Sequence, residues 1–209
     1  MPPLPRLVTP AFPFVVSGPS GVGKTVLCRA LLERLPRSER SISATTRPQR
    51  AGEVDGESYF FYSAERFHRE REANGMAEWA EVHGHLYGTP KAWLDQKLEA
   101  GITVVLNIDV QGGMNIRLRY PGAVLVFLLP PSIEELEHRL RGRKTDSDDE
   151  IRRRLNRALS ELQMVDRYDY ALVNGDLEEA MAELLAIARA ERARVARCLP
   201  SAANEGGSR

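Results

Sequence analysis

One short segment carries the residue types that bind the phosphates of a nucleoside triphosphate. It matches the pattern G-x-x-x-x-G-K-[ST] with the residues Gly18, Pro19, Ser20, Gly21, Val22, Gly23, Lys24 and Thr25. Glycines let backbone N–H groups wrap around phosphate oxygens, and the dipole of a following helix adds to the attraction. The lysine reaches the β- and γ-phosphates, and the next hydroxyl can bind Mg²⁺. We therefore expect all eight residues to bind ATP, Lys24 to be catalytic and Thr25 to be a magnesium ligand.

The flanking sequence fits this use of the loop. Residues 12–17 are mostly apolar and predict a buried strand, and residues 24–35 predict an amphipathic helix that Pro36 ends. The motif arises by chance in about one chain per hundred of this length, so an accidental glycine-rich turn is a poor alternative. The loop indicates a nucleoside triphosphate but does not identify what receives the phosphate.

A second basic segment lies at residues 43–53, which read SATTRPQRAGE. Arg47 and Arg50 stand three residues apart among hydroxyls and ahead of a glycine turn. The guanidinium fork suits bidentate binding of phosphate. From these residues alone, a phosphate site and a solvated loop are equally good interpretations.

A wider set of segments resembles the guanylate kinase family. The segments are 41–61 (SISATTRPQRAGEVDGESYFF), 78–80 (EWA), 87–89 (YGT), 108–112 (IDVQG) and 139–143 (RLRGR). They occur in the family's order, and the likeness covers residues 12–197. The resemblance implies an α/β fold with a P-loop NTPase core, whose parallel sheet is flanked by helices, plus a GMP-binding insertion and a helical lid. It also implies ATP-dependent phosphorylation of GMP and dGMP in purine nucleotide metabolism, with Mg²⁺ as cofactor.

The resemblance assigns the acceptor side to matching positions. Those that would hold the phosphate of GMP are Arg47, Arg50, Tyr59 and Tyr87, and the other GMP-binding positions are Ser43, Glu78, Thr89, Asn107 and Asp109. The chemistry agrees, because guanine offers N1–H and N2–H₂ donors and a carboxylate accepts them. Without the resemblance, Glu78 would be interpreted as a surface acid.

The resemblance also implies cationic residues in the lid. The matching catalytic arginines are Arg139, Arg143 and Arg154, and the position on the adenine side is Asn174. Phosphoryl transfer spreads charge over oxygens, so positioning and cationic stabilisation supply most of the catalysis. Three other arginines, Arg152, Arg153 and Arg157, lie outside the motif, and we interpret them as the solvated face of a helix.

Two positions depart from the family. Asn107 stands where the family usually has an acidic residue, so it keeps a carbonyl acceptor but lacks the negative charge. Lys144 stands where glycine is frequent, which predicts a stiffer lid hinge.

The pattern of apolar residues indicates the elements that carry these positions. Continuous apolar runs at 102–106 and 123–129 and a strand at 170–173 are typical of a parallel sheet buried on both faces. Thr89 and Pro90 predict a helix start, and Ser147 with Glu150 predicts another. Residues 177–197 predict one long closing helix.

These elements suggest one domain with two insertions. We expect a single domain at 12–199, between disordered tails at 1–11 and 200–209. Its parts are a core (12–39, 90–131 and 167–199), a GMP-binding part (40–89) and a lid (132–166).

Composition limits the partners to small molecules. The chain has 209 residues, with 29 basic and 29 acidic side chains, so its net charge does not favour nucleic-acid binding. Two isolated cysteines, no apolar leader and no membrane-length apolar run predict a cytoplasmic protein with no membrane partner. The expected ligands are ATP and GMP, and both a monomer and a homo-oligomer remain open.

The sequence suggests two alternative functions. The first is a non-catalytic guanylate-kinase-like binding module, which would usually lack an intact phosphate loop. The second is a P-loop kinase for another small phosphate acceptor, against which Glu78 and the segment 43–50 argue.

Overall fold

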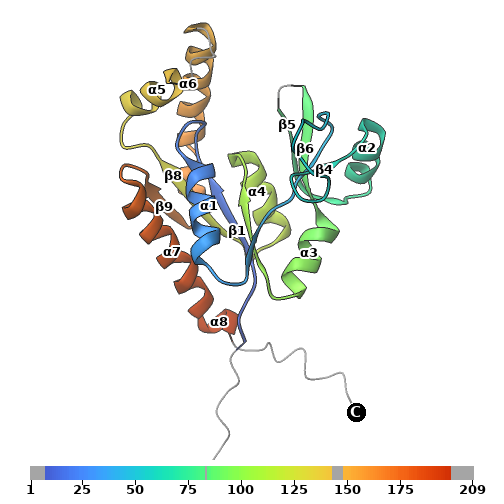
Figure 1. The fold of residues 1–209 in the computed structure, drawn as a ribbon. Helices are drawn as coiled ribbons and strands as arrows, with labels where there is room; N and C mark the ends of the chain where they lie inside the picture. Colours follow the sequence, from blue (N-terminus) through green and yellow to red (C-terminus); the bar gives the residue numbers. More distant parts are fainter. Residues whose placement is uncertain (1–7, 83, 143–147, 199–209) are drawn as a thin grey trace, which may run out of the picture.

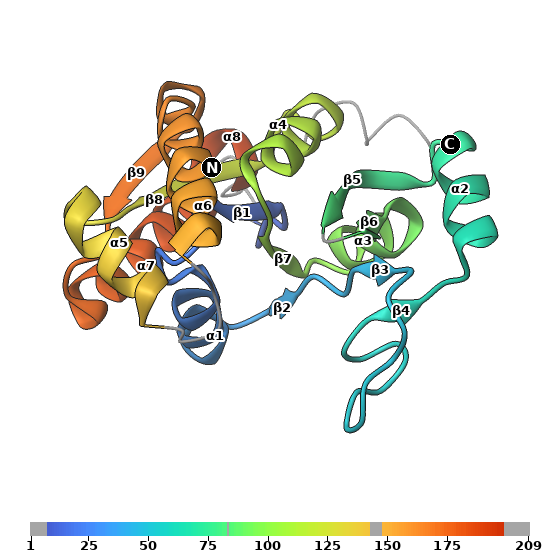
Figure 2. The same ribbon diagram turned by 90° about the horizontal axis from the view of Figure 1, so that it is seen from above.

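A parallel sheet forms the centre of the computed structural model, which describes residues 8–82, 84–142 and 148–198. Among these residues the sheet has five strands in the order β2-β7-β1-β8-β9. Figure 1 labels β1, β8 and β9, and Figure 2 labels all of them. The strands are β1 (Pro13–Ser17), β2 (Ser38–Arg40), β7 (Thr103–Asn107), β8 (Val124–Leu129) and β9 (Tyr170–Val173). The three central strands are the predicted apolar runs, and the β2 edge strand was not predicted.

Helices cover both faces of this sheet and explain the apolar runs. On one face, α1 (Lys24–Arg34) and α7 (Leu177–Ala193) pack on Phe14 and Val16. On the other face, α3 (Lys91–Glu99) and α4 (Val110–Arg119) pack on Val15. Successive residues of a strand point to opposite faces of the sheet. Because helices cover both faces, the residues that point to either face are apolar. The predicted α/β fold class, a parallel sheet flanked by helices, is confirmed.

A second, smaller sheet is inserted between β2 and α3. Its strand order is β4-β3-β6-β5. The elements are β3 (Ala44–Thr45), β4 (Phe60–Phe61), α2 (Ala64–Glu72), β5 (Met76–Val82) and β6 (His85–Pro90). Phe67 of α2 packs against Met76 and Ala44 in a separate small core.

A pair of helices forms the other insertion, between β8 and β9. They are α5 (Ile133–Arg141) and α6 (Asp148–Leu162), which pack through Leu136, Leu140 and Ala158, and the short 3₁₀ helix η1 (Val165–Arg167) follows them. Figure 2 shows α5 and α6 on one side of the molecule and the second sheet on the other, with β1 and β7 between them. Within the described residues, no helix is both long and apolar enough to cross a membrane.

Two predicted helix ends are wrong. Thr89 does not cap α3; the cap residue is Pro90, because the Thr89 hydroxyl donates to Glu78 instead. The predicted single helix at 177–197 breaks at Arg194, whose backbone is extended, and α8 (Val195–Cys198) follows. The start predicted at Ser147 lies outside the described residues, as does the tail 200–209.

The buried carboxylate of Glu191 explains the break before α8. Its side chain is 3% exposed and accepts from the Tyr170 hydroxyl at 2.5 Å, and it pairs with Arg194 and with Arg197 at 2.9 Å. A straight helix would carry Arg197 away from this carboxylate. At the same corner, the Val8 N–H donates to the Cys198 carbonyl, which ties the start of the described chain to its end.

We predict that Glu191→Gln lowers the free energy of unfolding by about 3 kcal/mol, because it leaves the Arg197 charge without its buried partner. Burial opposes ionisation of Glu191, but the Tyr170 hydrogen bond and the Arg197 charge outweigh it and lower its pKa. A lowered carboxyl pKa stabilises above the unfolded pKa, and this contribution is lost as pH falls through the folded pKa. Denaturant unfolding at pH 7 and pH 4 should show the deficit shrinking in acid. The control is Glu183→Gln on the exposed side of α7; equal stability of the two variants at pH 7 would refute the role of Glu191.

Candidate active site

The phosphate loop joins the end of β1 to the start of α1 in a backbone conformation that needs glycine. Gly18 and Gly23 have φ angles of 142° and 99°, in the region that side chains disfavour. A Cβ on Gly18 would lie 2.4 Å from the Leu128 carbonyl oxygen, and one on Gly23 would lie 2.3 Å from Asn174 Nδ2. Lys24 Nζ donates to the carbonyls of Gly18 at 2.6 Å and Pro19 at 3.0 Å. The lysine is therefore held inside the loop that it serves.

Asn174 supports this loop from below. Its side chain is 6% exposed, and Nδ2 donates to the Val22 carbonyl at 2.6 Å. Arg139 of α5 donates to the Asn174 carbonyl at 3.2 Å and to Glu135 at 2.8 Å. Asn174 and Arg139 therefore support the loop through these hydrogen bonds. Their direct contact with a nucleotide stays a prediction.

Two further contacts tie the loop to β7 and to α6. Asn107 Nδ2 donates to Thr25 Oγ1 at 3.1 Å, and Arg154 Nη2 donates to Ser20 Oγ at 2.7 Å. The first places the departure from the family directly beside the predicted magnesium ligand. The second brings a lid arginine onto the loop from a helix that is 134 residues away in the sequence.

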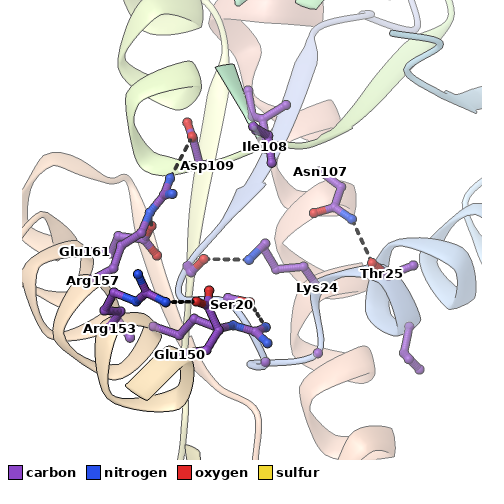
Figure 3. Close-up of a pocket in the computed structure, with 17 residues that line it drawn as sticks. Ser20, Lys24, Thr25, Asn107, Ile108, Asp109, Glu150, Arg153, Arg157 and Glu161 are labelled. Carbon is purple, nitrogen blue, oxygen red and sulfur yellow. Dashed lines mark hydrogen bonds and ion pairs between the residues drawn. The ribbon is translucent and has the colours of Figure 1, made fainter. Parts of the chain in front are cut away.

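A cavity of about 780 Å³ opens beside the loop (Figure 3). The predicted residues that line it are Gly18, Ser20, Gly21, Gly23, Lys24, Thr25, Asn107, Asp109 and Arg154. Pro19, Val22, Arg139 and Asn174 lie behind this lining, and Arg143 lies outside the described residues. Val82 at the end of β5 also lines the cavity. The cavity therefore reaches from the phosphate loop to the second sheet.

On the second sheet, Arg47 lies among aromatic rings. Its guanidinium carbon is 5.4 Å from the ring centroid of Tyr59, whose ring is 6.0 Å from that of Tyr87. Glu53 accepts from Arg47 Nη2 at 2.7 Å and from the Arg50 backbone N–H at 2.8 Å. The hydrogen bond to Glu53 raises the pKa of Arg47, which stays cationic. Glu53, which the sequence did not single out, therefore joins Arg47 to the backbone of Arg50, while Arg47 itself contacts the ring of Tyr59.

The carboxylate of Glu78 is buried between the second sheet and α4. It is 5% exposed and accepts from Thr89 Oγ1 at 2.6 Å, and the Ser41 hydroxyl lies 3.3 Å from that of Thr89. Burial raises the pKa of Glu78 to about 7; the Thr89 hydrogen bond opposes this rise, and the negative charge of Asp109 adds to it. A Cβ on Gly112 would lie 3.1 Å from Glu78 Oε2, so glycine there leaves room for the carboxylate.

Ser43 lies on the same sheet, where its backbone carbonyl accepts from the Phe60 N–H at 2.9 Å and joins β3 to β4. Its predicted contact with guanine is not tested by this bond. The insertion that forms the second sheet carries all the predicted acceptor residues except Asn107, the last residue of β7, and Asp109, which lies two residues further on.

The oxygen atoms near the loop fit a metal ion that arrives with ATP. No cluster of three acidic, histidine or cysteine residues that could hold a metal occurs in the described part of the chain. Mg²⁺ usually keeps several waters and binds one or two protein oxygens together with substrate phosphates. The Thr25 hydroxyl and the Asn107 amide oxygen, both on residues that line the cavity, could supply that number of ligands.

Comparison with known proteins identifies the family. The family model described as guanylate kinase matches residues 11–191 of this chain. The chain belongs to the guanylate kinase family. The guanylate kinase of Caldanaerobacter subterraneus is 48% identical over 183 residues, 88% of this chain and 89% of that protein. The guanylate kinase of Aromatoleum aromaticum is 49% identical over 182 residues, 87% of this chain and 89% of that protein.

A solved structure gives the same result for the guanylate kinase fold. The crystal structure of guanylate kinase from Anaplasma phagocytophilum has a TM-score of 0.73 at 33% identity and covers 92% of each chain. The family resemblance drawn from the motifs is therefore confirmed. The roles of the individual residues stay predictions.

Two arginines of α6 line the cavity although the sequence did not single them out as site residues. Arg153 and Arg157 were interpreted as the solvated face of a helix, and their side chains are indeed 74% and 64% exposed; both also line the cavity, together with Glu161. Arg152 is 77% exposed and is absent from the lining of this cavity. A signal existed: residues three or four apart share a helix face, and Arg157 lies three residues after Arg154.

We predict that GMP binding releases protons from Glu78 near pH 6.5. The raised pKa leaves this carboxyl largely protonated there, whereas guanine's two N–H donors pair with the ionised form. Calorimetry in buffers of different ionisation enthalpy measures the release. Because the GMP phosphate also titrates near pH 6, the informative quantity is the release by wild type minus that by Glu78→Gln. A difference of zero would show that Glu78 does not meet guanine in its ionised form.

We also predict that Arg47→Ala weakens GMP binding by about 10-fold or more and changes ATP binding less than 2-fold, because one charge-assisted bidentate contact is lost. Titration calorimetry with each nucleotide measures both effects. The matched control is Arg69→Ala, an exposed arginine of α2 on the same insertion. Equal losses for ATP and GMP would place Arg47 outside the acceptor site.

Proposed function

We propose that this chain transfers the γ-phosphate of Mg·ATP to GMP, and also to dGMP, in the manner of a guanylate kinase. The observation that carries the proposal is a single cavity that extends from an intact phosphate loop to Asp109, which lies close enough to Glu78 to raise its pKa. The donor and acceptor phosphates would meet inside this cavity.

The donor side is suited to hold a triphosphate. The loop N–H groups and the Lys24 ammonium would bind its phosphates, and Arg154 would add a cation from α6. A divalent metal carried by the nucleotide and held at Thr25 would offset the charge of the phosphate oxygens. Closure of α5 and α6 towards the second sheet would exclude water, so that the phosphoryl group goes to GMP rather than to hydrolysis.

The acceptor side is suited to guanine and not to adenine. The ionised carboxylate of Glu78 only accepts hydrogen bonds, so it pairs with guanine N1–H and the 2-amino group and repels the lone pair on adenine N1. Thr89 orients this carboxylate through its 2.6 Å hydrogen bond. The deoxyribose of dGMP leaves these contacts unchanged, which supports its use as a second acceptor.

The two alternative functions are not favoured. A non-catalytic module has no need of the lysine and hydroxyl that follow the loop glycines, and this chain keeps both Lys24 and Thr25. A P-loop kinase for another small phosphate acceptor has no need of the buried carboxylate of Glu78, which is 5% exposed.

We predict that a coupled assay of ADP release detects activity with GMP and dGMP and about 10⁴-fold less with AMP, because a mismatched base leaves a buried polar group unpaired. Glu78→Gln should collapse the GMP/AMP ratio of kcat/KM. Its control is Glu81→Gln, an exposed acid on the same strand, and Lys24→Ala supplies the background rate.

Two results would contradict this function. The first is ADP release by the folded wild type that does not depend on GMP. The second is a GMP/AMP ratio that Glu78→Gln and Glu81→Gln leave equally unchanged, which would make guanine selection independent of Glu78.

A further inference from the structure

One face of α6 borders the cavity along most of the helix. Its pocket-lining residues recur at spacings of three and four, as expected for one side of a helix: Glu150, Arg153, Arg154, Arg157, Ala158 and Glu161. Arg154 reaches the phosphate loop at Ser20. Arg157, about one turn further along, reaches the other end of the cavity.

Arg157 is held there by two carboxylates. Its Nε donates to Glu161 Oε1 at 3.0 Å, and its Nη2 lies 3.5 Å from Asp109 Oδ2 at the start of α4. Figure 3 shows the guanidinium pointing from α6 towards Asp109. The Arg157 side chain is 64% exposed, whereas that of Glu161 is 11% exposed. An exposed guanidinium is therefore hydrogen-bonded to a mostly buried acid.

The surroundings place Arg157 between the donor and acceptor sides. Burial raises the pKa of Glu161, and the charges of both Arg157 and Lys24 oppose this rise, so one carboxylate lies within electrostatic reach of both cations. Lys24 marks the donor phosphates. Asp109 lies on the acceptor side and acts electrostatically on Glu78. Lys24, Asp109, Arg157 and Glu161 all line the same cavity, so a phosphoryl group transferred within it would come close to this cluster.

We propose that Arg157 is a further phosphate-binding arginine, which exchanges Asp109 for phosphate oxygens when both nucleotides are bound. The inference rests on the proposed function. An exposed guanidinium–carboxylate pair at 3.5 Å contributes little and is easily released. A bidentate contact with phosphate is charge-assisted and stronger. While the cavity holds no nucleotide, the same arginine neutralises Asp109, whose charge would otherwise repel an incoming phosphate.

The experiment compares Arg157→Ala with Arg152→Ala on the same helix. Arg152 is 77% exposed and lies outside the lining of the cavity. We expect Arg157→Ala to lower kcat/KM for GMP by about 10²-fold, the usual loss when one charge-stabilising donor is removed. ATP binding to the free protein and the melting temperature should match those of Arg152→Ala. Added guanidinium at millimolar concentration should restore part of the rate of Arg157→Ala and leave Arg152→Ala unaffected.

Three results would overturn the inference. If wild type phosphorylates GMP and Arg157→Ala retains the same kcat/KM as Arg152→Ala, Arg157 does not bind phosphate and the proposed function stands. If Arg157→Ala loses rate together with thermal stability and guanidinium restores nothing, the ion pair with Asp109 is only structural. If wild type does not phosphorylate GMP, the proposed function and this inference both fail.

Discussion

The hydrogen bonds that hold the phosphate loop bring together the distant parts of this molecule. The bonds are Asn174 to Val22, Arg154 to Ser20, and Asn107 to Thr25, and they come from the turn after β9, from α6 and from β7. The loop glycines have positive φ angles, which other residues disfavour. Because glycine backbones can adopt several conformations, these hydrogen bonds help to select the one that the loop adopts. Arg154 thereby connects α6 to the loop, and the strand that bears Asn107 also leads to Asp109 on the acceptor side.

Carboxylates pair with arginines on both the donor and the acceptor side and hold their guanidinium groups in place. Glu53 holds Arg47 against Tyr59, and Asp109 with Glu161 holds Arg157. Arginine loses several rotatable bonds of freedom on binding phosphate, so advance ordering reduces the entropic cost of binding. Glu78 is different, because its neighbours bury it and raise its pKa instead of supplying a counter-charge. A buried carboxylate without a counter-charge is suited to bind the N–H donors of a neutral base, whereas the arginines paired with carboxylates are suited to bind phosphates.

Local sequence patterns predicted the loop, the central strands and the family because each depends on residues close together in the chain. The features that were missed depend on distant partners. Thr89 is a residue type that often caps helices, but its hydroxyl donates to Glu78 on the neighbouring strand. The closing helix breaks at Arg194 because Arg194 and Arg197 pair with the buried Glu191. The edge strand Ser38–Arg40 is polar and forms through its pairing with β7. Arg157 is solvated, as the sequence indicates, but its place beside the cavity was missed because its partner Asp109 caps another helix, 48 positions earlier in the numbering.

The central claim is that the cavity delivers a phosphoryl group from the loop to a guanine nucleotide and not to water. A single-turnover reaction tests it, with the protein in excess over γ-labelled ATP, Mg²⁺ present and GMP added or omitted. The account predicts that with GMP the label appears in GDP, with little in inorganic phosphate, and that without GMP the ATP stays intact over the same time. Release of the label as inorganic phosphate at the same rate with and without GMP would contradict the account.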